Sequence, residues 1–400
     1  MKLLQKNLKR PVTIWGVTLS PFVLKMQSYL EYYNIPYRRL PDHGDYLENI
    51  HTLLRLEYQK QHKLVTRYPA MSPVLDEYPA VPFYSEDGRN FQYDSSAVAL
   101  LLDDTSTQVK PPLFPSEPVL NFIATLIDEA FDEFGLYMVH HMRWVGSAKS
   151  NMMGKLLAKE FRHALPPGGP LVLSKRFPKR QVRRCPYLFS CAPKGYRVSL
   201  PRSLRPPSKE GFPETHTLLK ECWKQYLKGM EEVLSKQKFL LGEQFTIADA
   251  SAYGQLAMNL VDPEANKQIQ ELAPTTHAWL EMIHAGKHRQ YKASGELRLS
   301  KSLSLLLNTI MSSYASLMVQ NRQAYHYAKA QGETEFNEQA FNQGRALYSG
   351  KLRGYPFKSV VKTFQVRTWH ELCQKWCQLK QAEKDSLKQY LELCELFDAN

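Results

Sequence analysis

The sequence predicts an α+β fold, with a βαβ unit and a β-hairpin near the N-terminus and helices beyond. Residues 12–17 and 35–40 are β-rich runs, and the helical pattern between them begins at Ser20-Pro21 and ends at Asn34. A strand, a helix and a strand at this spacing make a βαβ unit with a right-handed crossover. From residue 119 onward apolar and aromatic residues recur at helical spacing, which predicts an all-α part.

Length and composition favour a globular protein of more than one domain. The 400 residues, with 43% apolar content, are enough for two domains and an appended third. No window approaches the roughly 18 apolar residues of a spanning helix, so we expect no membrane partner. Residues 1–10 are basic but lack the apolar stretch of a secretory signal, and six cysteines are too few for a disulfide framework. Both features predict a cytoplasmic location.

The net charge of +13 resides almost entirely in one segment. Between residues 161 and 209 the chain has twelve basic side chains and no acidic one. They are Arg162, Lys175, Arg176, Lys179, Arg180, Arg183, Arg184, Lys194, Arg197, Arg202, Arg205 and Lys209. Prolines and the lack of a clear period mark about 165–212 as an insertion. Its arginines, with Tyr187, Phe189 and Tyr196, would suit RNA, although a solvated basic loop is the simpler interpretation.

Residues 79–98 are the most informative stretch. Asp87-Gly88 is a hairpin turn signal between two short aromatic β-rich runs. Pro82 cannot donate to a ladder, so it begins a strand or lies on an edge, where backbone is available to an extended ligand. Asp94 and Ser95 precede an apolar helical run, so this helix N-terminus would accept a carboxylate.

This order of features resembles the glutathione site of the cytosolic glutathione S-transferases, in a serine-class-like and bacterial-like form. The resemblance implies a thioredoxin-like N-terminal domain in which Pro82 is cis. It also implies that Val81 pairs through its backbone with the cysteinyl part of glutathione, and that Asp94 and Ser95 take the γ-glutamyl end. Ala80 stands where the family often has a lysine, and we assign no residue to the glycine end.

Ser20 begins the first helix in a Ser-Pro-Phe turn. In family members with this turn the serine is the catalytic side chain, which implies that role for Ser20. A hydroxyl donor and a helix N-terminus would both favour the thiolate of glutathione, whose thiol has a pKa of about 8.5 by analogy with cysteine. The alternative is an ordinary N-cap followed by Pro21 at the first helical position, and the two interpretations do not exclude each other.

The resemblance continues into the helical part. By position it implies an electrophile pocket made from Phe22, Tyr137, His141 and Trp144, although residues at this spacing are more often core. Thr246-x-x-Asp249 is a capping box that in this family opens a buried helix. The resemblance covers residues 12–283, interrupted by the insertion and by an extended second helix at 45–66.

Residues beyond 284 show no further family pattern. We predict helices at 301–330, 336–348 and 368–396, with a basic and aromatic connection at 350–358. Cys373 and Cys377 share a helix face, but no second pair completes a metal site, and we assign no metal ligand.

These observations predict three domains: 11–104, thioredoxin-like and glutathione-binding; 118–284, all-α with the basic insertion; and 285–400, a helical extension of unknown role. The resemblance implies a transferase that uses glutathione as co-substrate, attacks a small electrophile in detoxification and forms a homodimer. The alternative is a noncatalytic scaffold whose basic insertion holds RNA or an acidic partner, and nucleic acid is the less favoured partner.

Overall fold

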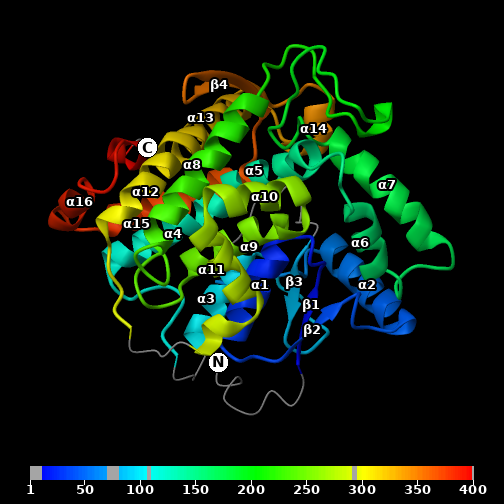
Figure 1. Cartoon of the computed structure of the whole chain (residues 1–400), viewed down its shortest axis with the longest axis horizontal. Coiled ribbons are helices and arrows are strands. Elements are labelled where there is room, and N and C mark those ends of the chain that lie inside the picture. The colour runs from blue at the N-terminus through cyan, green and yellow to red at the C-terminus, as the bar shows by residue number, and fades with distance from the viewer. Residues whose placement is uncertain (1–10, 70–80, 106–109, 291–294, 399–400) are drawn as a thin grey trace.

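The computed structural model describes residues 11–69, 81–105, 110–290 and 295–398 (Figure 1). Its N-terminal domain contains β1 (Val12–Trp15), α1 (Pro21–Tyr32), β2 (Tyr37–Leu40), α2 (Tyr46–Gln61), β3 (Phe83–Ser85) and α3 (Ser95–Thr105). Central β1 pairs in parallel with β2 and antiparallel with β3. The predicted α+β class and thioredoxin-like βαβ unit are confirmed.

The predicted hairpin forms around Asp87, whose Oδ1 accepts hydrogen bonds from the amides of Arg89 (2.7 Å) and Asn90 (2.8 Å). Its second strand is reduced to one bridge, in which Tyr84 and Gln92 exchange two backbone hydrogen bonds of 2.8 Å. Pairing therefore ends close to residue 94, where α3 begins. The short hairpin brings Val81 and the start of α3 to the same edge of the sheet.

The helical domain begins with one long rod, formed by α4 (Pro118–Ala130), a π-helical turn η1 (Phe131–Gly135), α5 (Leu136–His141) and a second π-helical turn η2 (Met142–Gly146). It continues with α6 (Met153–Glu160), α7 (Gly169–Arg183), α8 (His216–Leu234), α9 (Ile247–Ala257), α10 (Pro263–Leu272) and α11 (Pro274–His284). The basic insertion is thus ordered around a 15-residue helix, α7.

Helix α9 joins the two domains. The predicted capping box is present, with the Thr246 amide donating to Asp249 Oδ2 at 2.9 Å. About two turns into the helix, α9 meets α1 at Gly254, where an added Cβ would lie 2.5 Å from the Pro21 carbonyl oxygen and 2.8 Å from Lys25 Cβ. Only glycine permits this approach. The contact holds the start of α1 against the helical domain.

The extension contains α12 (Ser304–Ile310), α13 (Ser316–Ala330), α14 (Glu338–Asn342), β4 (Leu347–Leu352), β5 (Tyr355–Val360), α15 (Thr363–Gln378) and α16 (Gln381–Leu387). The continuous helical run Lys301–Ala330, which includes α12 and α13, is long and apolar enough to span a membrane, but 67% of its most apolar window is buried in the core. Figure 1 shows α12, α13, α15, α16 and β4 on the side of the helical domain away from α2 and α7, whereas α14 lies near α7.

Three predictions for the extension are wrong. Residues 336–348 form only the short α14, and the segment interpreted as a connection is an antiparallel hairpin, β4 with β5. Its turn is Arg353-Gly354, where both residues have positive φ (51° and 85°). The predicted helix 368–396 instead begins at Thr363, ends at Gln378 and is followed by the separate α16.

Candidate functional site

One cavity of about 250 Å³ lies where the N-terminal domain, the helical domain, the insertion and the extension meet. Six of the residues singled out from the sequence line it, namely Phe22, Val81, Pro82, Asp94, Ser95 and Tyr137. The remaining lining residues are Asp132, Glu133, Leu136, Arg184, Tyr187, Leu188, Lys362, Phe364 and Gln365. Aromatic and aliphatic walls therefore surround a small number of charged groups.

The Val81–Pro82 peptide, which is cis, forms one wall of the cavity. Ladder pairing of β3 with β1 ends at the pair formed by Phe83 and Trp15. The Val81 amide and carbonyl form no hydrogen bond with the part of the chain that the structure describes. An extended peptide lying in the cavity would find these backbone groups available.

Asp94 is the N-cap of α3, but its carboxylate is already fully engaged. Oδ1 accepts the amides of Ser96 (3.1 Å) and Ala97 (3.2 Å), and Oδ2 accepts Arg67 Nε at 2.6 Å and Arg367 Nη2 at 2.9 Å. Burial alone would raise the pKa of Asp94, yet the two arginines hold it below its usual value. The Asp94 carboxylate thus holds two arginines, while Asp94 and Ser95 both line the cavity, and their role toward the γ-glutamyl end stays a prediction.

Arg367 comes from α15, so the extension reaches the N-terminal domain at this corner. The same helix supplies Glu371, which pairs with Arg67 at 3.0 Å. Arg367 also lies over the ring of Phe364, 4.3 Å from its centroid, and its Nη1 is buried without a hydrogen-bond partner among the described residues. Asp94 and Glu371 balance the charges of Arg67 and Arg367, so the N-terminus of α3 is the positive feature left at this corner.

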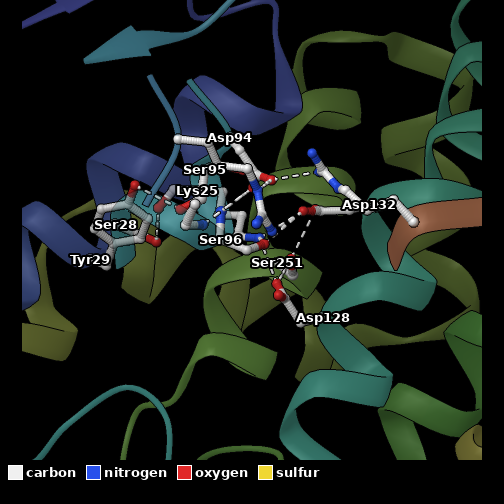
Figure 2. A network of polar contacts seen from close by, with 12 residues as sticks. Lys25, Ser28, Tyr29, Asp94, Ser95, Ser96, Asp128, Asp132 and Ser251 are labelled. Carbon is white, nitrogen blue, oxygen red and sulfur yellow. Dashed lines mark hydrogen bonds and ion pairs between the residues drawn. The ribbon is translucent and has the colours of Figure 1, made fainter. Parts of the chain in front are cut away.

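Behind the corner lies a buried network centred on Lys25 (Figure 2). Lys25 Nζ donates to Asp128 Oδ1 (2.5 Å), Asp132 Oδ2 (2.6 Å) and Ser96 Oγ (2.7 Å). Ser251 of α9 bonds to both carboxylates, at 2.6 and 2.9 Å. Burial alone would lower the pKa of Lys25, but the two carboxylates raise this pKa above its usual value. The network connects α1, α3, the long rod and α9.

Two carboxyls of the rod face the cavity with raised pKa values. Burial raises the pKa of Asp132 to about 6, although Lys25 opposes the shift. Burial likewise raises the pKa of Glu133 to about 7. The Gln365 amide, which donates to the Tyr137 hydroxyl at 2.8 Å, lies beside them. Near neutral pH the cavity therefore contains groups that can hold or release a proton.

Ser20 lies at the N-cap of α1 and is 8% exposed, and it is not among the residues that line the cavity. Its side chain makes no capping hydrogen bond. The other hydroxyl of this turn, on Thr18, is occupied by Glu160, which also accepts the Thr18 amide at 3.1 Å. Arg143 fixes the turn from behind, since its Nη1 donates to the Leu19 carbonyl at 3.0 Å.

His141 and Trp144 lie outside the cavity, so the expectation that they line it is corrected. His141 is fully buried one turn beyond Tyr137, with its Nδ1 2.8 Å from Ser190 Oγ. Trp144 packs edge-on against Phe177 of α7, with ring centroids 5.7 Å apart. The insertion therefore covers the end of the rod, and the core interpretation applies to both residues.

The insertion and the extension supply lining residues that the sequence analysis did not assign to this cavity. Lys362 Nζ lies 4.9 Å from the ring centroid of Tyr137 and 4.3 Å from that of Tyr187, and Arg184 lies 5.6 Å from Tyr187. The sequence offered one signal for them, the basic and aromatic composition of both segments. It offered none for their meeting in space.

The family model "Glutathione S-transferase, C-terminal domain" matches residues 202–286. Among solved structures, the beta-etherase LigF from Sphingobium sp. strain SYK-6 is 15% identical, with a TM-score of 0.40, and the match covers 69% of this chain and 96% of LigF. A glutathione S-transferase from Rhodospirillum rubrum F11 is 13% identical, with a TM-score of 0.37 and coverage of 74% and 91%. No curated protein matches the chain.

At these identities and TM-scores the likeness says nothing about substrate or reaction. The matched segment contains the capping box and α9, which the structure places directly against the thioredoxin-like domain. The serine class is not confirmed. Residues 202–286 therefore match the C-terminal domain of the glutathione S-transferases, and the thioredoxin-like domain packs against that matched segment.

Proposed function

We propose that the cavity binds glutathione and that the protein is a glutathione transferase, which activates the thiol for attack on an electrophilic small molecule. One observation carries the proposal: the Val81–Pro82 peptide, the start of α3 and aromatic side chains of the rod line a single cavity. The cysteinyl part would pair with the open backbone of Val81. The γ-glutamyl end would meet Asp94 and Ser95 at the N-terminus of α3, behind which Arg67 and Arg367 hold the Asp94 carboxylate.

Calorimetry with reduced glutathione tests binding. Arg367→Gln should weaken the affinity roughly 10-fold, because it removes a charge-assisted hydrogen bond that holds the Asp94 carboxylate at the start of α3. Lys388→Gln is the matched control, since it removes an exposed, ion-paired cation from the same extension. The control should bind as the unaltered chain does. Absence of heat at millimolar glutathione would refute the proposed function.

Ser20→Ala should lower the rate of conjugation of an aromatic halide by roughly 10²-fold, because one positioned hydroxyl donor to the thiolate is lost. The affinity for glutathione should remain nearly the same. Ser20→Thr keeps a hydroxyl and should recover most of the rate. Equal rates for Ser20→Ala and the unaltered chain would show that Ser20 only occupies the N-cap position of α1 and takes no part in the reaction.

The rest of the cavity favours flat, apolar electrophiles. Phe22, Tyr137, Tyr187 and Phe364 supply aromatic surface, whose burial contributes roughly 25 cal/mol per Å². Lys362 and Arg184 add positive charge beside that surface. An aromatic electrophile that carries an acidic group would match both features.

A homodimer, a cytoplasmic location and a role in detoxification complete the proposal on the strength of the family. Symmetric dimers are the commonest arrangement of soluble oligomers. Light scattering at micromolar concentration should give twice the mass of the 46.3 kDa chain. A measured mass equal to that of a single chain would contradict the proposed dimer, but it would not contradict the proposed glutathione binding.

The alternative, a noncatalytic scaffold for RNA, loses its stacking partners in the structure. Tyr187 and Phe189 are 7% and 2% exposed and belong to the core. Tyr196 packs edge-on against His216, with centroids 5.2 Å apart. Base stacking on Tyr187 and Phe189 would therefore require the core to open, which leaves only the half-buried Tyr196, and we do not favour this function.

A further inference from the structure

Helix α7 presents a basic face to solvent. Its opposite side packs on α6, where an added Cβ at Gly154 would lie 2.1 Å from the Ser174 carbonyl oxygen. The exposed bases are Lys175, Arg176, Lys179, Arg180 and Arg183. None of them forms an ion pair with a carboxylate within the described ranges of the chain. The hairpin of α6 and α7 therefore holds five unneutralised cations on one surface.

The segment that follows α7 in the same chain adds to this positive charge. The turn Arg202–Leu204 lies against α7, and Arg202 and Arg205 are both exposed. Residues 161–209 contain no acidic side chain. Because the Debye length is about 8 Å at physiological salt, such closely spaced cations act together on an anionic surface that approaches within that distance.

Exposed aliphatic side chains stand at the N-terminal end of the same helix. Leu171 is 63% exposed and Val172 is 49% exposed. The start of α2 lies beside the connection between α6 and α7, where Asn49 Nδ2 donates to the His163 carbonyl at 3.1 Å. Leu47, in the first turn of α2, is 77% exposed. Figure 1 shows α2 and α7 at the same edge of the molecule. Cations and aliphatic groups are thus exposed together there.

Exposed cations beside exposed aliphatic side chains fit an anionic bilayer better than a nucleic acid. Nucleic acids take cations and aromatic stacking partners, but the insertion's Tyr187 and Phe189 are buried. An anionic bilayer takes cations at its headgroups and aliphatic side chains at the acyl boundary. We propose that the exposed face of α7, with the adjoining start of α2, is a docking surface for anionic phospholipid membranes. The protein lies on the bilayer and does not span it.

Sedimentation of the full chain with phospholipid vesicles tests this inference. The chain should bind vesicles that contain phosphatidylserine, should not bind phosphatidylcholine alone, and should dissociate at high salt. Replacing Lys179, Arg180 and Arg183 together by Gln should lower partitioning roughly 100-fold, since each cation contributes about five-fold. Leu171→Gln with Val172→Gln should lower it further at constant charge.

The matched control replaces Lys220, Lys224 and Lys228 by Gln, three exposed cations on α8. This control should stay within a few-fold of the unaltered chain, and all variants should keep its unfolding midpoint. An equal loss in the control would show attraction by net charge alone and overturn the proposal. So would a chain that binds single-stranded RNA through α7 yet leaves phosphatidylserine vesicles unbound.

Discussion

Lys25→Met should destabilise the protein by about 3–5 kcal/mol at pH 8, because it leaves Asp128 and Asp132 as buried carboxylates without their cation. Lys25 is fully buried, and methionine fills a similar volume, so lost packing contributes little. Domains are stable by only about 5–15 kcal/mol, so this change removes a large part of the total. Denaturant unfolding at pH 8 measures it.

A second variant tests whether the unpaired carboxylates cause the instability of Lys25→Met. The double variant Lys25→Met with Asp132→Asn removes one of the two unpaired charges and should recover part of the loss, as a double-mutant cycle would show. The cost should also shrink at pH 5, because Asp132 has a pKa of about 6 and takes up a proton there. A Lys25→Met chain as stable as the original at pH 8 would contradict the assignment.

The parts of the site that sequence predicted well are those set by local rules. Val81-Pro82, the Asp87-Gly88 turn and the Asp94 cap lie within 14 residues of one another, so hairpin geometry brings them together whatever the rest of the chain does. The capping box at Thr246 is local in the same way. Such features depend on backbone hydrogen bonds between near neighbours.

The parts that sequence could not predict depend on contacts between distant segments. Arg367 meets Asp94 across 273 positions, and the pairing of Arg67 with Glu371 spans 304. Nothing in the sequence pattern around Asp94 or Arg67 indicates that α15 will pack against them. The same reason explains Trp144, which helical spacing left open between pocket and core and which the insertion covers through Phe177.

The hairpin of β4 and β5 could not be predicted for a different reason, which is its weak strand propensity. Its strands contain Lys, Ser, Gly and Pro, residues that strands usually avoid, and both strands lie partly exposed. At Gly350 an added Cβ would lie 2.0 Å from Gln320 Oε1, so the Gln320 side chain of α13 packs directly on the β4 backbone. Tertiary contact with α13 therefore decides the structure of this segment, and propensity alone favours a loop.

Removal of the extension should prevent folding altogether. A chain that ends at Ala285 loses Trp369, Trp376 and Phe397, which belong to one core with the helical domain. Phe122 of α4 would lose two ring contacts, at centroid distances of 5.3 Å to Trp376 and 5.1 Å to Phe397. Truncating one buried aromatic residue to alanine costs about 3–5 kcal/mol, so the loss of three exceeds the stability of most domains.

The packing of α8 on α12 leads to the same expectation. An added Cβ at Gly229 of α8 would lie 2.8 Å from Leu306 Cα, so the two backbones touch, and deletion would bare a flat apolar strip along α8. Size-exclusion chromatography and near-ultraviolet circular dichroism should show an aggregated or loosely packed chain. Adding residues 286–400 as a separate polypeptide should restore a cooperative unfolding transition. A soluble, cooperatively folded 1–285 chain would show instead that the transferase-like domains are complete without the extension, and that Arg367 reaches the site as a later addition to an independent fold.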